Sequence, residues 1–273
     1  MLAPARDPVN GPERATSIAI SIMAAITTTS SRARQRGIGG AIAQLVAMLA
    51  AIFAFFTLAF QPFQIPSGSM TPTLKIGDYF LASKYDYGYS AHSVPFVAPL
   101  AAFSGRLFAR APKRGDIVLF HPVSDPTHVL IKRLVGLPGD RIQMIRGLLH
   151  INGRAVARER MDAVVDADYG RVRRWRETLP NGVSYVTFDL TDNGELDDTP
   201  VYTVPADHYF MMGDNRDDSA DSRVLSEVGY VPFENLIGRA QVIFLSLGEG
   251  VRAFELWGWP QALRPERIFT LPR

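Results

Sequence analysis

Cysteine is absent from the 273-residue sequence, and neither sign of charge is in large excess. Without cysteine the chain forms no disulfide, no thiolate metal site and no cysteine nucleophile. The formal net charge at pH 7 is +2, so the dense basic surface typical of nucleic-acid-binding proteins is not expected. Only five histidines occur, none of them in a recognisable catalytic or metal-binding pattern. Among nucleophiles, serine therefore becomes the residue type to examine.

One long hydrophobic run is present, IGGAIAQLVAMLAAIFAFFTLAF at 38–60. It is free of charge over about 23 residues, enough for a helix to cross a hydrocarbon core of about 30 Å. Arg32, Arg34 and Arg36 lie just before the run, and no basic residue follows it until Lys75. The positive-inside rule therefore predicts a single transmembrane helix with the N-terminus in the cytoplasm and the rest of the chain outside it.

This span divides the chain into three predicted parts. Residues 1–37 form a cytoplasmic tail without fixed structure, 38–60 the transmembrane helix, and 61–273 a β-rich extracytoplasmic domain. In the tail, the mildly apolar stretch 17–29 is short and Thr-rich, which favours tail over a second span, although both interpretations stay open. The apolar stretch 93–112 is either a core hairpin or a segment that dips into the lipid interface.

The domain after the span contains short apolar runs bounded by glycine and proline, such as GDIVLFHPV at 115–123 and THVLIKRLVGLPGD at 127–140. Their length and boundaries are typical of buried strands. Outside the hydrophobic run, no long segment has the 3.6-residue period of a helix. The sequence therefore predicts a mainly β fold, a barrel or a sandwich tethered by one helix.

The stretch PSGSMTPTL at 66–74 holds two serines separated by one glycine and flanked by prolines. Glycine and proline constrain the backbone here, so we expect the two serines to be held rigidly. Serine becomes a nucleophile only when a base removes its proton, and a polar surface turn is the alternative interpretation. A Ser-x-x-Lys arrangement is excluded because Met70 and Pro72 stand three residues after Ser67 and Ser69.

Lys132 lies within the strand-like run VLIKRLVG, where alternation places it on one face with Leu130 and Leu134. Burial among apolar side chains lowers the pKa of a lysine from about 10.4 and allows it to act as a base. The alternative is a lysine that reaches water from an edge strand. Arg133 then points to the opposite face and needs a partner, which the carboxylates of GDNRDDSADSR at 213–223 can supply unless that stretch is a solvated loop.

Four segments resemble, in the same order, the conserved boxes of bacterial type I signal peptidases (leader peptidases): FQIPSGSMTPTL (63–74), KRGDIVLF (113–120), IKRLVGLPGD (131–140) and YFMMGDNRDDSADSR (209–223). They follow a membrane anchor, as in that family, and the match covers most of 61–245. The resemblance implies a coiled, barrel-like antiparallel β catalytic domain with a small inserted β subdomain at about 141–204. It also implies a serine endopeptidase of the bacterial cytoplasmic membrane that removes signal peptides from exported preproteins. Cleavage would follow small residues in an A-x-A pattern and proceed through an acyl-enzyme.

The resemblance also assigns roles to individual residues. Ser69 is implied as the nucleophile and Lys132 as the general base of a Ser-Lys dyad. Ser67 is implied as the side-chain donor of the oxyanion hole, and Ser219 as the group that hydrogen-bonds and orients the lysine. Structural support would come from two ion pairs, Arg133 with Asp214 and Arg223 with Asp221. Shallow pockets for the small substrate residues would be lined by Phe63, Ile65, Met70, Leu74 and Ile131.

Signal peptides of preproteins and the lipid bilayer are the expected partners, and the enzyme is expected to act as a monomer without nucleic acid, metal or cofactor. Two alternatives stay open. One is a peptidase of the same family dedicated to a single pilin or conjugation protein, which would cleave only that client. The other is a non-enzymatic, membrane-tethered β domain that binds peptides, whose function Ser69→Ala and Lys132→Ala would leave intact.

Overall fold

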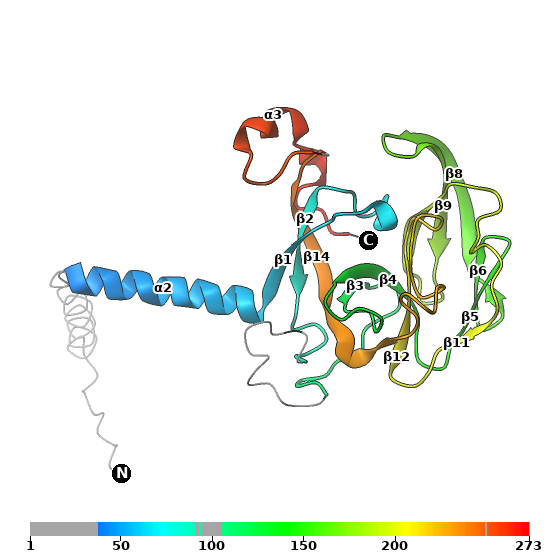
Figure 1. The fold of residues 1–273 in the computed structure, drawn as a ribbon, viewed down its shortest axis with the longest axis horizontal. Coiled ribbons are helices and arrows are strands. Elements are labelled where there is room, and N and C mark those ends of the chain that lie inside the picture. The colour runs from blue at the N-terminus through cyan, green and yellow to red at the C-terminus, as the bar shows by residue number, and fades with distance from the viewer. Residues whose placement is uncertain (1–37, 91–92, 94–104, 249, 273) are drawn as a thin grey trace, which may run out of the picture. The chain divides into compact units, whose positions relative to one another are not determined.

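The computed structural model describes residues 38–90, 93, 105–248 and 250–272 (Figure 1). The predicted tail at 1–37, including 17–29, and residues 94–104 of the apolar stretch lie outside these ranges. Helix α2 spans Ile38–Leu58 and carries no charged residue. Among the described residues, no helix meets the combined length and hydropathy of a membrane span. The transmembrane helix at 38–60 therefore stays a prediction.

Residues 55–273 form one unit that contains all the strands described. Its larger sheet has seven strands in the order β1-β2-β14-β3-β4-β12-β13, and every neighbouring pair in it is antiparallel. The sheet curls on itself (Figure 1), and the prediction of a mainly β, antiparallel domain is confirmed. The strands are β1 (Phe60–Gln64), β2 (Asp78–Ser83), β3 (Ile117–Phe120), β4 (Leu130–Gly136), β12 (His208–Met212), β13 (Val231–Pro232) and β14 (Leu236–Ser246).

The two strands at the middle of this sheet follow directly from the sequence pattern. β3 is wholly apolar, IVLF, and all four residues are buried because one face of the strand packs into one core cluster and the other face into a second. β14 is eleven residues long and pairs with both β2 and β3. Its register shifts at three points, and such bulges let one strand bend so that it serves two neighbours.

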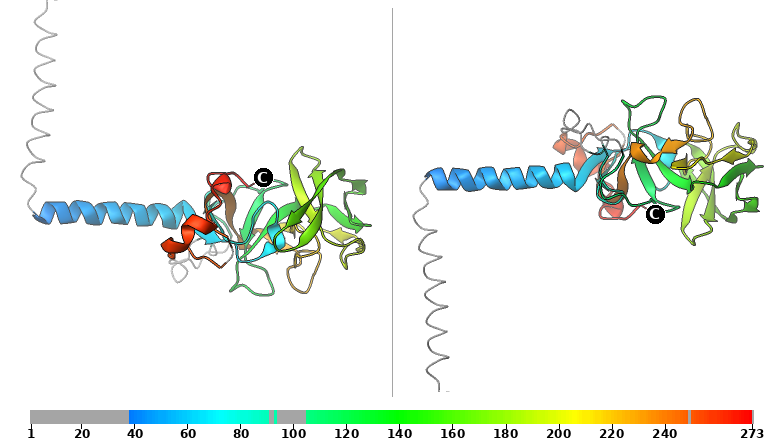
Figure 2. Two further views of the ribbon diagram at one scale, coloured as in Figure 1. Left: turned by 90° about the horizontal axis from the view of Figure 1, so that it is seen from above. Right: turned by 90° about the horizontal axis from the view of Figure 1, so that it is seen from below.

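Two smaller sheets are built from the chain between β4 and β12. One has four strands in the order β11-β5-β6-β7, and the other has three in the order β10-β9-β8. Both lie on the same side of the seven-stranded sheet in Figures 1 and 2. The strands are β5 (Arg141–Ile145), β6 (Leu148–Ile151), β7 (Arg154–Ala155), β8 (Ala157–Asp166), β9 (Gly170–Thr178), β10 (Ser184–Asp189) and β11 (Tyr202–Thr203).

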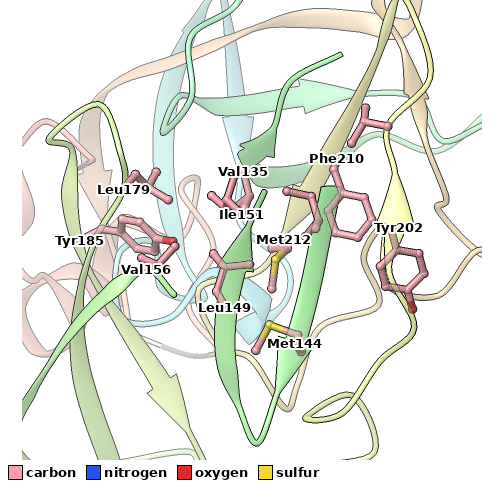
Figure 3. Close-up of a cluster of buried hydrophobic side chains, with 12 residues drawn as sticks. Val135, Met144, Leu149, Ile151, Val156, Leu179, Tyr185, Tyr202, Phe210 and Met212 are labelled. Carbon is pink, nitrogen blue, oxygen red and sulfur yellow. The ribbon is translucent and has the colours of Figure 1, made fainter. Parts of the chain in front are cut away.

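A core cluster of twelve buried residues joins the four-stranded sheet to β4 and β12 (Figure 3). Val135 comes from β4 and Phe210 from β12, while Met144 and Leu149 come from the β5–β6 hairpin. Burying each such side chain contributes about 1.5–3 kcal/mol. This packing fixes the smaller sheets against the two strands that frame the candidate site.

Short helical turns complete the described chain. Helix α3 spans Trp259–Ala262, and 3₁₀ turns lie at Gly68–Met70, Phe233–Asn235, Leu256–Gly258 and Pro265–Arg267. The first of these turns follows β1 directly and carries Ser69. It is buried, and Thr71 N donates to Gly68 O at 2.9 Å to close it.

Candidate active site

Ser69 and Lys132 meet where the Gly68–Met70 turn contacts β4, an inner strand of the curled sheet. Ser69 Oγ lies 2.7 Å from Lys132 Nζ, a hydrogen bond between side chains that are 63 residues apart in sequence. Ser69 is 8% exposed and Lys132 is 4% exposed, so neither reaches bulk water freely. The turn after β1 presents the serine, and β4 presents the lysine. A hydroxyl and an amine at this distance can share a proton.

Lys132 has the electrostatic setting of a base. Burial lowers its pKa from 10.5 to about 8, while the charges of Asp221 and Asp218 oppose the shift. Leu134 on the same face of β4 is fully buried, and Leu130 is half-buried. The lysine does not extend to water, because its side chain is buried and β4 is an inner strand of the sheet. A large share of the amine is therefore neutral near pH 8.

A cavity of about 560 Å³ opens onto this pair. Ser67 is exposed and lines the same cavity as Ser69. The other lining residues come from two loops and the start of β4: Pro122, Ser124, Asp125, His128, Leu130, Asp218, Ala220, Ser226, Glu227 and Val228. Ser69 and Lys132 line this cavity as well.

Ser219 lies close to the dyad but does not bind the lysine. It is 8% exposed, and its Oγ has no hydrogen-bond partner among the described residues. The expected hydrogen bond from Ser219 to Lys132 is therefore not formed in this structure. A Cβ built on Gly213 would lie 2.2 Å from Ser219 Oγ and 2.6 Å from the Ser69 carbonyl oxygen. Ser219 and Ser69 thus approach the same glycine, and only glycine fits between them.

The two expected ion pairs are both present. Arg133 donates two hydrogen bonds of 2.7 Å to the Asp214 carboxylate, and each side chain is 1% exposed. Arg223 donates two hydrogen bonds of 2.8 Å to Asp221, which also accepts one from Gly213 N at 2.9 Å. Paired, bidentate charges of this kind can be buried without a large penalty. They hold the loop 213–223 behind the dyad.

A third buried pair was missed by sequence reasoning. Arg216 donates to Glu177 at 2.9 and 2.6 Å, and Tyr185 Oη donates to the same carboxylate at 3.0 Å. The Arg133 guanidinium lies over the Tyr185 ring, 4.0 Å from its centroid. These contacts join β9 and β10 to the loop behind the dyad. The neighbouring sequence does not indicate that Glu177 is buried. It directly follows the arginine-rich stretch 171–176, which is typical of a solvent-exposed face.

The five apolar residues expected to line the substrate pockets gather in one cluster under β1, β2 and β14: Phe63, Ile65, Met70, Leu74 and Ile131. Ile65, Met70 and Leu74 are at most 1% exposed, whereas Phe63 and Ile131 are partly buried at the margin. None of the five lines the 560 Å³ cavity. The structure therefore brings these residues together, three of them as core.

A metal site does not emerge from the described part of the chain, where no three histidine or carboxylate side chains are grouped to hold an ion. Of the histidines described, His128 lines the cavity, and its ring pairs with the neighbouring Asp125. The lysine, not a histidine, contacts Ser69.

Comparison with known proteins decides the family. The model of the family described as "Signal peptidase, peptidase S26" matches residues 38–245, well over half of the chain. The chain belongs to this signal peptidase family. The resemblance drawn from the four sequence segments is thereby confirmed, and the protein is a serine peptidase of this family.

Curated relatives are similar in sequence to this chain along most of their length. Signal peptidase I of Rickettsia typhi is 41% identical over 227 residues, covering 78% of this chain and 85% of the relative. Signal peptidase I of Rickettsia akari is 38% identical over 258 residues, covering 89% and 94%. A crystal structure of a signal peptidase I from Enterococcus faecalis is 27% identical and covers 48% of this chain and 97% of that chain. Its TM-score of 0.29 is too low to support a statement about the fold.

Proposed function

We propose that this signal peptidase removes N-terminal signal peptides from exported preproteins with Ser69 as nucleophile and Lys132 as general base. The observation that carries the proposal is the 2.7 Å contact between Ser69 Oγ and Lys132 Nζ, both nine-tenths buried beside a cavity that admits a peptide. A lysine pKa near 8 supplies the base that a serine nucleophile needs.

The chemistry follows from the protonation state of the lysine. Neutral Lys132 takes the Ser69 proton while Oγ attacks the scissile carbonyl carbon, and the resulting ammonium protonates the departing amine of the mature chain. Lys132, neutral again, then takes a proton from the water that attacks the acyl-enzyme, and Ser69 leaves as the hydroxyl. One amine performs each proton transfer.

The oxyanion of the tetrahedral intermediate needs donors fixed in advance. Ser67 Oγ–H and the backbone N–H of Ser69 are proposed for this role, since both belong to the same short turn and Ser67 faces the cavity. One such donor contributes about 2.7–4 kcal/mol in comparable hydrolases.

Ser219 is proposed to orient Lys132 during turnover. Its hydroxyl is buried beside Ser69 without a partner. An unsatisfied buried hydroxyl costs about 1–3 kcal/mol, so it is available to accept a hydrogen bond from the ammonium once Lys132 has taken the serine proton.

Specificity for small residues is proposed to arise at the margin of the apolar cluster. Phe63 and Ile131 are its partly exposed members, and the buried Ile65, Met70 and Leu74 behind them leave no depth for a large side chain. The first and third substrate residues before the scissile bond (−1 and −3) would contact Phe63 and Ile131 first. An extended peptide would place both residues on one side, because alternate side chains of a strand share a face.

The proposed cellular setting is a bacterial cytoplasmic membrane, with a cytoplasmic tail at 1–37, a single-pass anchor at 38–60 and a monomeric catalytic domain at 61–273 on the outer side. The inserted subdomain would correspond to about 141–204. Along α2, large apolar side chains such as Leu45 and Phe53 are more than half exposed, which supports a lipid environment for the helix. Retention of the full chain in membranes after alkaline carbonate washing, lost in Leu45→Asp/Phe53→Asp, tests the anchor.

The test of the function uses the purified full chain in detergent with several unrelated preproteins. Wild type should release each mature chain at the A-x-A site, as read by mass spectrometry, while Ser69→Ala and Lys132→Ala release none. Cleavage of a single client would favour the dedicated pilin or conjugation-protein peptidase instead. Variants that keep full function would favour a non-enzymatic peptide-binding domain.

A further inference from the structure

The turn between β8 and β9 contacts the nucleophile turn through Tyr169. A Cβ built on Gly68 would lie 1.8 Å from Tyr169 Oη and 2.9 Å from Tyr169 Cζ, and its three nearest neighbours are all atoms of this phenol. The end of the tyrosine ring therefore occupies the space that a side chain at position 68 would fill. Gly68 stands between the two serines of the site, so the contact is made at the centre of the nucleophile turn.

The hydroxyl of Tyr169 also bridges to the loop on the other side of the dyad. It donates a hydrogen bond of 2.5 Å to Asp218 Oδ2, and Asp218 lines the cavity. Within the same loop, Asn215 N donates to Ser69 O at 3.1 Å. Burial, followed by the neighbouring Asp218, raises the pKa of Tyr169 above its ordinary value, so the phenol keeps its proton and acts as the donor.

A second contact holds the same end of the hairpin. Lys75 Nζ lies 3.2 Å from Asp166 Oδ2, and Asp166 is 7% exposed. The other oxygen of Asp166 accepts a hydrogen bond from Asp168 N at 3.1 Å, which shapes the turn that carries Tyr169. The hairpin is thus tied to the chain after the nucleophile at Lys75, while Tyr169 rests on Gly68.

We propose that Tyr169 is a positioning residue for the reaction: it presses on Gly68 and ties the Ser67–Ser69 turn to Asp218, fixing the oxyanion donors relative to Lys132. This proposal rests on the roles of Ser69 and Lys132 proposed above. Displacement of a catalytic group by about 1 Å can cost about 100-fold in rate. A residue from β8–β9, outside the seven-stranded sheet, therefore controls how well the oxyanion hole is formed.

The first experiment compares Tyr169→Ala and Tyr169→Phe with wild type in the full chain, using a purified preprotein. Tyr169→Ala should lower kcat about 10- to 100-fold with KM within about twofold, because Gly68, which Tyr169 contacts, is not part of the apolar substrate cluster. Tyr169→Phe keeps the ring against Gly68 and should lose less, about three- to tenfold. Val165→Ala, in the same hairpin at a residue 84% exposed, is the control and should match wild type.

Three results separate the outcomes. An unchanged kcat in Tyr169→Ala, or a loss that appears in KM and leaves kcat intact, overturns the positioning role. Activity in Ser69→Ala, assayed alongside, would overturn the dyad itself and is therefore a different failure. If Tyr169→Ala loses both its activity and its cooperative thermal transition, the variant has unfolded. The Gly68→Ala comparison below then tests the positioning role.

That comparison places Gly68→Ala in three backgrounds, which are wild type, Tyr169→Phe and Tyr169→Ser. In wild type the added methyl group must displace the phenol, and kcat should fall at least about tenfold. Combined with Tyr169→Phe, the same methyl still meets the ring, and the loss should persist. In the Tyr169→Ser background the space beside Gly68 is open. Adding Gly68→Ala there should lower kcat by less than about twofold relative to Tyr169→Ser alone. Losses that multiply in the Ser background would show that the two positions act independently and would overturn the proposal.

Discussion

Lys132 and Arg133 are consecutive residues of β4 whose charged groups lie on opposite sides of the strand. Lys132 Nζ contacts Ser69 Oγ, whereas Arg133 forms two hydrogen bonds with Asp214. Among the described residues no carboxylate lies within hydrogen-bond distance of the Lys132 amine, and burial lowers its pKa, while Arg133 forms an ion pair with Asp214. One strand thereby carries the proposed base on one face and an ion-paired arginine on the other.

The pH dependence of cleavage should follow the deprotonation of the Lys132 amine. With a pKa of about 8, Lys132 is protonated and inactive in acid, so kcat/KM should rise about tenfold per pH unit below pH 8 and level off above it. Initial rates from pH 6 to 10 measure this limb. His128→Asn, which removes the described histidine that lines the cavity, should leave the profile unchanged. A limb near pH 6.5 that disappears in that variant would identify a histidine base instead.

Breaking the buried pair behind β4 should cost stability. In Asp214→Ala, Arg133 keeps its charge at 1% exposure without its carboxylate partner, and the free energy of unfolding should fall by about 3–5 kcal/mol. Urea unfolding in detergent measures the loss. Asp192→Asn weakens an ion pair with Arg173 in which the aspartate is 84% exposed, and it should change stability by less than about 1 kcal/mol. Equal losses in both variants would contradict this account.

Much of the dyad could be predicted because its determinants are local. Alternation in VLIKRLVG placed Lys132 between two leucines, and the structure has it buried on that face of β4. The pairing of Arg133 with a carboxylate of 213–223 also follows from the need to neutralise buried charge, whereas the pairing of Arg223 with Asp221 was implied only by the family resemblance. Strands β3 and β4 were likewise predicted by the short apolar runs at 115–123 and 127–140, which glycine and proline bound.

The remaining site residues could not be predicted because tertiary packing decides their positions. Tyr169 and Glu177 reach the site only because β8 and β9 dock against it, and nothing in their neighbouring residues encodes that docking. For Ile65, Met70 and Leu74, hydrophobicity fits a pocket wall and a core equally well. Their burial distinguishes the two only once the fold is known.

Ser219→Ala tests whether the Ser219 hydroxyl orients Lys132 during the reaction or has no part in it. If Ser219 engages the lysine during turnover, kcat should fall about tenfold or more, because a general base contributes about 10²–10⁴-fold when correctly placed. Stability should not fall, since the hydroxyl has no partner to lose in the structure. Kinetics and urea unfolding are measured on the same preparation. An unchanged kcat, with a free energy of unfolding that rises by about 1–3 kcal/mol, would show that the buried hydroxyl destabilises the fold and has no role in catalysis.

Ser67→Ala should remove one of two oxyanion donors and leave the dyad in place. The loss is expected in kcat, about 10²- to 10³-fold, with little change in KM, since the donor acts on charge that develops only in the transition state. Ser124→Ala is the matched control: Ser124 lines the same cavity, but its hydroxyl donates to the Glu227 carbonyl and is not available to an oxyanion. A peptide aldehyde that forms a covalent adduct with Ser69 provides a second measurement. Its tetrahedral oxyanion should bind Ser67→Ala more weakly by about the factor lost in kcat, and equal binding to both proteins would remove Ser67 from the oxyanion hole.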